Sequence, residues 1–147
     1  MPIKLCRELR SKNPDIKYVV FLNNLFLNVF IAHALLKYDI GYMGTTRKNV
    51  EGILSDLLEA KAANRVLKWN ERVALVIGKS LCFLWQDNNA VLAITTAFSL
   101  HRDEDSIIVN RRRLKPTLTN AVVVLPVFKD RPRKELAIPH TIDAYNH

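Results

Sequence analysis

One stretch near the N-terminus limits the folds that this chain can adopt. Residues 16–22 form a largely apolar run with strand character, and residues 29–37 form an apolar segment of helical length. Asn28 precedes that segment, and its side chain can accept a hydrogen bond from an unpaired backbone N–H at the start of a helix. A second run with strand character, residues 40–45, follows at once. A strand, a helix and a strand at this spacing predict a parallel pair joined by a right-handed crossover, and therefore an α/β fold.

Other segments flank this unit. Residues 4–11 predict the end of a helix, and residues 50–64 predict another, with an apolar stripe on one side. From Arg65 the apolar residues follow the period of strands. Four short segments with turn residues between them predict an antiparallel meander; they read RVLKW, RVALVI, SLCFLW and AVLAITTAF.

The C-terminal third is more strongly charged. Residues 102–134 predict a charged loop with one strand, at residues 121–125. Pro139 is suited to the first position of a helix, because its missing N–H is not needed there. The sequence therefore predicts that a helix begins at Pro139.

Length and charge restrict the class of protein. A chain of 147 residues suits one domain with a sizeable core. It has 22 Lys and Arg against 14 Asp and Glu, for a formal charge of +8, which favours polyanionic partners such as nucleic acid. The apolar run at residues 19–36 is interrupted by three asparagines and a histidine, so we expect it to be protein core and expect no membrane partner.

Two basic segments are candidates for phosphate contact. Residues 44–49, GTTRKN, combine two hydroxyls, the cations Arg47 and Lys48, and an amide. Residues 110–115, NRRRLK, include Arg111, Arg112 and Arg113, whose guanidinium groups can each bind phosphate in two places. A solvated turn explains the first segment equally well, and a plain exposed loop the second.

Polar residues elsewhere give few signs of chemistry. The four histidines and two cysteines have no metal-ligand spacing, so we expect no metal site built on them. We expect His33 to be a core histidine. Asn23 and Asn24 stop a buried strand at its C-terminal end, where ligand sites of open α/β sheets lie. On composition alone, a turn that pairs with loop backbone is the favoured interpretation.

Four blocks together resemble the middle of a piggyBac-type DDE transposase. They read VVFLNNLFLN, YMGTTRKNVEGI, LCFLWQDNNAVLAITTAFS and IPHTIDAYNH, and the resemblance runs from about residue 16 to the end. It implies an α/β fold with a partial ribonuclease H-like core of strand, helix and strand, interrupted by an antiparallel β insertion. The implied domains are residues 1–64 for the partial core, 65–134 for the insertion and 135–147 for the start of a returning core helix.

The resemblance also implies what the polar residues do. Members of this family hold two divalent ions such as Mg²⁺ between three aspartates, and Asn23 takes the place of the second aspartate. We expect the first aspartate upstream of residue 1 and the third after residue 147. Because Mg²⁺ prefers carboxylates and a two-metal site needs their charge, we expect no bound metal and no catalysis.

The expected protein is thus a truncated, inactive transposase derivative in the nucleus. The resemblance implies DNA contact by Arg47 and Lys48, and the basic run adds Arg111 to Arg113, so we expect weak binding to the DNA backbone. The alternative is an interaction module that pairs with a full-length transposase or a host protein.

Overall fold

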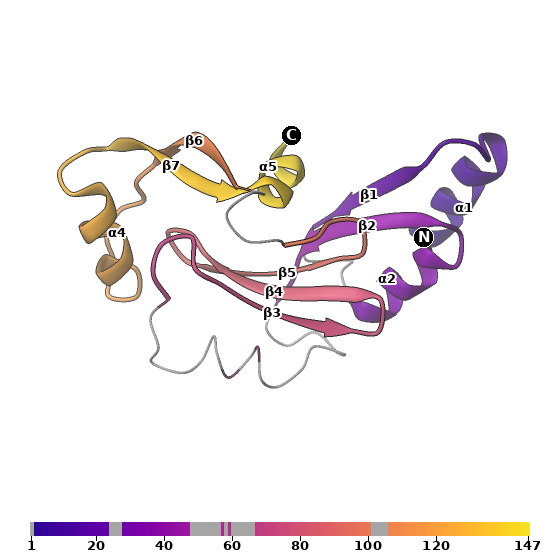
Figure 1. Cartoon of the computed structure of the whole chain (residues 1–147), viewed down its shortest axis with the longest axis horizontal. Coiled ribbons are helices and arrows are strands. Elements are labelled where there is room, and N and C mark those ends of the chain that lie inside the picture. Colours follow the sequence, from indigo (N-terminus) through magenta and orange to yellow (C-terminus); the bar gives the residue numbers. More distant parts are fainter. Residues whose placement is uncertain (1, 24–27, 48–56, 58, 60–66, 101–105) are drawn as a thin grey trace.

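The structure, a computed structural model, describes residues 2–23, 28–47, 57, 59, 67–100 and 106–147. A five-stranded mixed sheet forms its centre (Figure 1). In the spatial order β1-β2-β5-β4-β3, its strands are β1 (Tyr18–Leu22), β2 (Ile40–Thr45), β5 (Ala90–Thr95), β4 (Ser80–Gln86) and β3 (Arg72–Ile77).

The pairing confirms two sequence predictions. β1 and β2 are parallel, with Tyr18 opposite Ile40 and Leu22 opposite Gly44. β3, β4 and β5 form an antiparallel meander, and β5 also pairs antiparallel with β2. The meander therefore continues the sheet that the parallel pair begins. The domain boundaries at residues 64 and 134 stay a prediction.

The crossover between the parallel strands is α2 (Val29–Leu36). The Asn28 side chain caps it, since its Oδ1 accepts a hydrogen bond of 2.8 Å from the Ile31 N–H. The predicted N-terminal helix is present as α1 (Pro2–Lys12). The helix predicted at residues 50–64 lies mostly outside the described residues. No described helix is long and apolar enough to cross a bilayer.

Each face of the sheet has its own core. On one face, α1 and α2 pack against the strands. This core includes Cys6, Val29, Ala32, Leu35, Tyr42, Cys82, Leu84 and Ile94. On the other face lie β6 (Ser106–Arg112), β7 (Arg133–Pro139) and α5 (His140–Asn146), which are drawn above the sheet in Figure 1. Its core includes Met43, Phe83, Trp85, Ala93, Ile138 and Ile142.

Three predictions for the C-terminal third are wrong. Residues 106–112 are a strand, not a loop, and pair antiparallel with β7 in a second, two-stranded sheet. Residues 121–125 belong to a helix, α4 (Ala121–Phe128), and not to a strand. A local turn precedes it, in which the buried Asn120 accepts a hydrogen bond of 2.8 Å from the Thr117 N–H. The helix predicted here is confirmed as α5, but Pro139 is the residue before it, with an extended backbone, and not its first residue.

The start of the meander also differs from the prediction. Residues 67–69 of the expected strand RVLKW lie outside any strand, and Trp69 and Asn70 form a turn. Asn70 has φ of 62°, a conformation that asparagine tolerates better than most residues. Its Oδ1 accepts a hydrogen bond of 2.9 Å from Trp85 Nε1, which ties this turn to β4.

Candidate nucleic-acid interface

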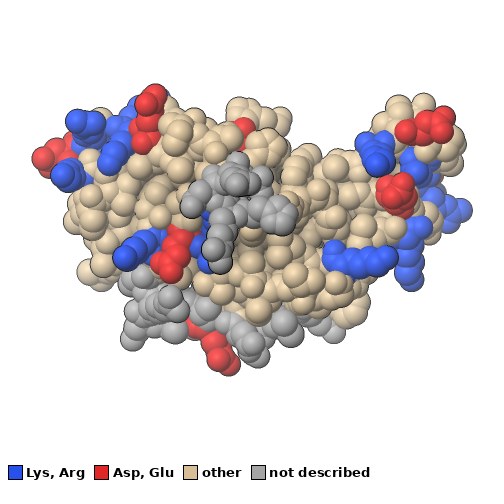
Figure 2. All heavy atoms as spheres, viewed as in Figure 1, with Lys and Arg blue, Asp and Glu red and all other residues tan. Residues whose placement is uncertain are grey.

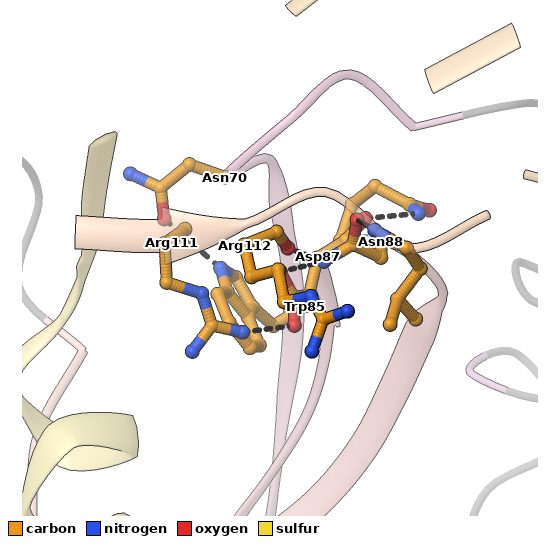
Figure 3. A network of polar contacts seen from close by, with 8 residues as sticks. Asn70, Trp85, Asp87, Asn88, Arg111 and Arg112 are labelled. Carbon is orange, nitrogen blue, oxygen red and sulfur yellow. Dashed lines mark hydrogen bonds and ion pairs between the residues drawn. The ribbon is translucent and has the colours of Figure 1, made fainter. Parts of the chain in front are cut away.

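The three consecutive arginines at the end of β6 do not form one patch. Successive strand residues point to opposite faces, so Arg111 faces the main sheet and Arg112 faces away from it. Arg111 forms an ion pair with Asp87, in the turn between β4 and β5 (Figure 3). The side chains of Arg111 and Asp87 are 24% and 15% exposed. Arg111 therefore holds the two sheets together, and Asp87 neutralises most of its charge.

Arg113 and the neighbouring backbone also form hydrogen bonds within the fold. The Arg113 guanidinium donates to the Lys129 carbonyl oxygen, and its backbone N–H donates to Pro132 O at 2.9 Å. Asn88 lies beside Asp87 in the same turn (Figure 3). Its Oδ1 accepts a hydrogen bond of 3.1 Å from the Leu114 N–H. Of the three arginines, Arg112 is thus the exposed one.

Arg112 has a second arginine as its cross-strand neighbour. In the β6–β7 register it lies directly opposite Arg133, which is also exposed. Directly opposed side chains share one face of a sheet, with Cβ atoms about 5 Å apart, and like charges there destabilise the pair. Glu135 lies on the same face, opposite Asn110, and offsets part of this charge. The two arginines still give this end of the two-stranded sheet a net positive charge.

The surface shows where cations gather. Lys and Arg side chains cluster at the end of the molecule formed by β6, β7 and α4, and again around α1 at the opposite end (Figure 2). Arg133 was missed by the sequence analysis. The antiparallel register that places it beside Arg112 could have revealed it, but residues 106–112 were expected to be a loop.

Arg47 belongs to a different segment from the arginines of β6. It is exposed and follows β2, which belongs to the five-stranded sheet. Lys48, its expected partner in DNA contact, lies outside the described residues. The two predicted basic segments therefore extend from strands of different sheets.

Asn23 is the residue directly after β1, at the carboxyl end of the parallel pair, and it is exposed. Aromatic residues gather at this end of the sheet. The Phe21 ring centroid is 6.2 Å from that of Phe98 and 6.3 Å from that of Tyr145. The Tyr145 hydroxyl also lies 3.3 Å from Thr45 Oγ1, at the end of β2, which fixes α5 against this edge.

These residues do not fit a two-metal centre. Asn23 offers a neutral amide, and Asp143, in α5, has its Oδ1 3.4 Å from His147 Nε2. In the part of the chain that the structure describes, no three His, Cys, Asp or Glu side chains are grouped to hold a metal ion. The expectation that no metal binds stays a prediction.

The remaining titratable candidates are packed into the fold. His33 is half-buried, with Nε2 3.3 Å from the Ile77 carbonyl oxygen. Cys6 and Cys82 are buried free thiols. Burial raises the pKa of the Cys82 thiol to about 11 and that of Cys6 above its ordinary value. Low-pKa thiolates are the reactive form of cysteine, so neither residue has the character of a nucleophile.

Comparison with known proteins agrees with this fold. The model of a family described as Transposase IS4, of the DDE type, matches residues 1–146. A search of curated proteins finds no match. Among solved structures, the chain is similar to the cryo-EM structure of a piggyBac transposase synaptic complex with hairpin DNA, at 16% identity and a TM-score of 0.53. That match covers 69% of this chain and 22% of the transposase chain.

At this identity the structural likeness shows the fold alone, while the family match extends over nearly the whole chain. The resemblance predicted from the sequence is confirmed at the level of a DDE transposase domain. The chain belongs to the IS4 family of DDE transposases.

Proposed function

We propose that this chain corresponds to the central part of a piggyBac-type transposase, has lost catalysis, and keeps weak affinity for the DNA backbone. The fold supports the relation to piggyBac, and the structure that it resembles is of a synaptic complex with hairpin DNA. Asn23, a neutral amide at the end of β1, supports the loss of catalysis. A neutral oxygen leaves a two-metal site short of the charge that holds hard divalent ions.

The proposal of DNA contact rests on the Arg112–Arg133 pair. The two arginines are paired directly across the strands and are both exposed, so their side chains share one face. An anion that binds there relieves the repulsion between their like charges. A phosphate oxygen pair accepts the parallel N–H groups of an arginine fork, and this geometry favours phosphate over a smaller anion. In this proposal Arg47 and Lys48 form a second contact with DNA. Arg111 and Arg113 instead stabilise the fold through their contacts with Asp87 and Lys129.

A salt titration of DNA binding tests this proposal. We expect the affinity for a short duplex, measured by fluorescence anisotropy, to fall as salt rises, because cations on phosphate compete with counterions. The double variant Arg112→Gln/Arg133→Gln should lower the magnitude of the salt slope by about 2, roughly one unit for each phosphate that is no longer neutralised. Arg7→Gln/Lys12→Gln removes the same charge from the exposed surface of α1 and is the control.

Equal losses of affinity in the two double variants would show that only net charge matters and that the Arg112–Arg133 pair is not a site. Binding that does not change with salt would exclude contact through phosphates altogether.

The alternative function, an interaction module, is favoured by β1. Among the described strands β1 lies at an edge of the five-stranded sheet, with β2 as its neighbour. Its side chains Val19 and Phe21 are each 42% exposed. An edge strand presents unpaired backbone groups to which a strand of another protein can add, and apolar side chains strengthen such pairing. The partner in this proposal is a full-length transposase or a host protein.

Co-purification in high salt separates the two functions, because high salt releases a protein that binds DNA through phosphates. A partner retained in high salt should be absent from a Val19→Lys variant. Val76→Lys places the same charge on β3, at the other edge, where Val76 is 69% exposed, and should keep the partner. If both variants keep it, the partner does not bind at the β1 edge.

Nuclear localisation is part of the proposal, and imaging of a tagged chain tests it.

A further inference from the structure

A hollow of about 310 Å³ lies between the C-terminal end of α2 and the turn that joins β3 to β4. It is lined by His33, Leu36, Lys37, Gly78 and Lys79. None of these residues belongs to the β6–β7 surface or to the end of β1, so the hollow is separate from both sites discussed above. Its volume is at the lower end of the range for small-molecule sites.

One wall of the hollow is fixed by a tight turn. Gly78 has φ of 60° and is the first of two residues between β3 and β4, the position that glycine occupies in a type II′ hairpin. A Cβ atom at Gly78 would lie 3.2 Å from His33 Cε1 and 3.3 Å from Nε2. The ring of His33 is also held by its contact of 3.3 Å between Nε2 and the Ile77 carbonyl oxygen. The imidazole and the turn are thus packed together before any ligand arrives.

The side chains around the hollow are basic. His33, Lys37 and Lys79 line it, and no Asp or Glu is among the described lining residues. Asp39 follows Lys37 by two positions, but its Oδ2 accepts a hydrogen bond of 2.9 Å from Arg10. This acid is therefore engaged with another cation. Two ammonium groups around one concave surface repel each other, and an anion bound between them removes that repulsion.

We infer that this hollow is a binding site for a phosphate group. Lysine ammonium groups bind phosphate as mobile point charges. His33 lies beside them as part of the wall, because its Nε2 is turned to the Ile77 carbonyl oxygen. The fixed turn provides a preformed wall, which lowers the entropy cost of binding. The phosphate comes either from a small phosphate ester or from a DNA backbone, and the experiment distinguishes these sources.

Calorimetric titration of the whole chain with pyrophosphate tests the inference. We expect saturable binding, and we expect Lys37→Gln/Lys79→Gln to weaken it by about tenfold or more, because a neutral amide replaces each ammonium group that binds the phosphate. Lys12→Gln/Lys17→Gln removes two exposed lysines elsewhere and should leave pyrophosphate affinity unchanged. In NMR spectra the backbone amides of Gly78 and Lys79 should shift on titration in the wild type and not in the double variant at positions 37 and 79.

Absence of saturable binding, or equal affinity in the wild type and Lys37→Gln/Lys79→Gln, would overturn the inference. If pyrophosphate binds as expected, DNA affinity identifies the source. A parallel loss of DNA affinity in the same variant assigns the hollow to a backbone phosphate, and unchanged DNA affinity assigns it to a small phosphate ester. Failure here leaves the Arg112–Arg133 proposal intact, because that surface lies on other elements.

Discussion

Asn23 is the residue on which the proposed loss of catalysis depends, and its replacement tests that proposal. We expect Asn23→Asp to restore a carboxylate without creating Mg²⁺-dependent DNA cleavage. A two-metal centre needs several carboxylates, and the described residues bring no such group together. Nicking of supercoiled plasmid with and without Mg²⁺ measures the outcome. Asn23→Ala is the control, because it removes the amide without adding a carboxylate. Metal-dependent nicking by Asn23→Asp alone would show that other acids complete the site.

The same residue shows what could and could not be predicted from sequence. Its position after a strand was predictable from the apolar run that ends at Leu22, and β1 ends there. Its proposed role rests only on a family resemblance, because on composition alone an amide at a strand end indicates a turn more often than a site. Arg111 shows the reverse case. Its partner Asp87 is 24 residues away, and no local pattern indicates which acid a cation will meet.

At the scale of elements, the helix cap at Asn28 and the apolar run of β2 predicted the structure correctly. Asn28 marked the start of α2, and β2 has the predicted bounds. The strand β6 was missed, because charged residues obscure its alternation of apolar and polar side chains. Its outward face carries the apolar Ile108, 66% exposed, beside charged residues. The run of valines from residue 122 to 124 favours a strand by propensity, but it lies in α4, where Val123 and Val124 are buried. Tertiary packing overrides β-propensity there.

The link between the two sheets can be tested through Arg111 and Asp87. We expect Arg111→Met to lower the free energy of unfolding by about 1–3 kcal/mol, because it leaves a mostly buried carboxylate without its cation. Arg112→Met, one residue away, faces solvent and should change it by no more than about 0.5 kcal/mol. Urea unfolding measures both. Asp87→Asn combined with Arg111→Met should recover part of the stability, and equal effects of the two single arginine variants would contradict the assigned roles.

At the scale of the whole molecule, the five-stranded sheet lies between α1 and α2 on one face and β6, β7 and α5 on the other. This arrangement separates the two basic sites. The β3–β4 turn and α2 lie toward one end of the molecule in Figure 1, and the end of β6 that bears Arg112 lies toward the other. Substitutions at distant sites without shared partners usually add. Combining the variants of both sites should therefore give the sum of their separate effects on DNA affinity.

Cys82 reports whether the whole sheet forms, because it lies on β4 in the core beneath α2. Burial raises the pKa of its thiol from 9.0 to about 11. At pH 8 the thiolate fraction in the folded chain is then lower by roughly a hundredfold than in the unfolded chain, before steric protection is counted. In a Cys6→Ser chain we expect slow reaction with a thiol reagent in buffer and fast reaction in denaturant. Equal reaction rates in buffer and denaturant would mean that the chain does not hold the sheet on its own.

The same thiol should make the stability of the chain depend on pH. The folded pKa of Cys82 exceeds the unfolded one, so Cys82 contributes stability below pH 9 that is lost as pH rises toward 11. Cys82→Ala should remove this part of the pH dependence.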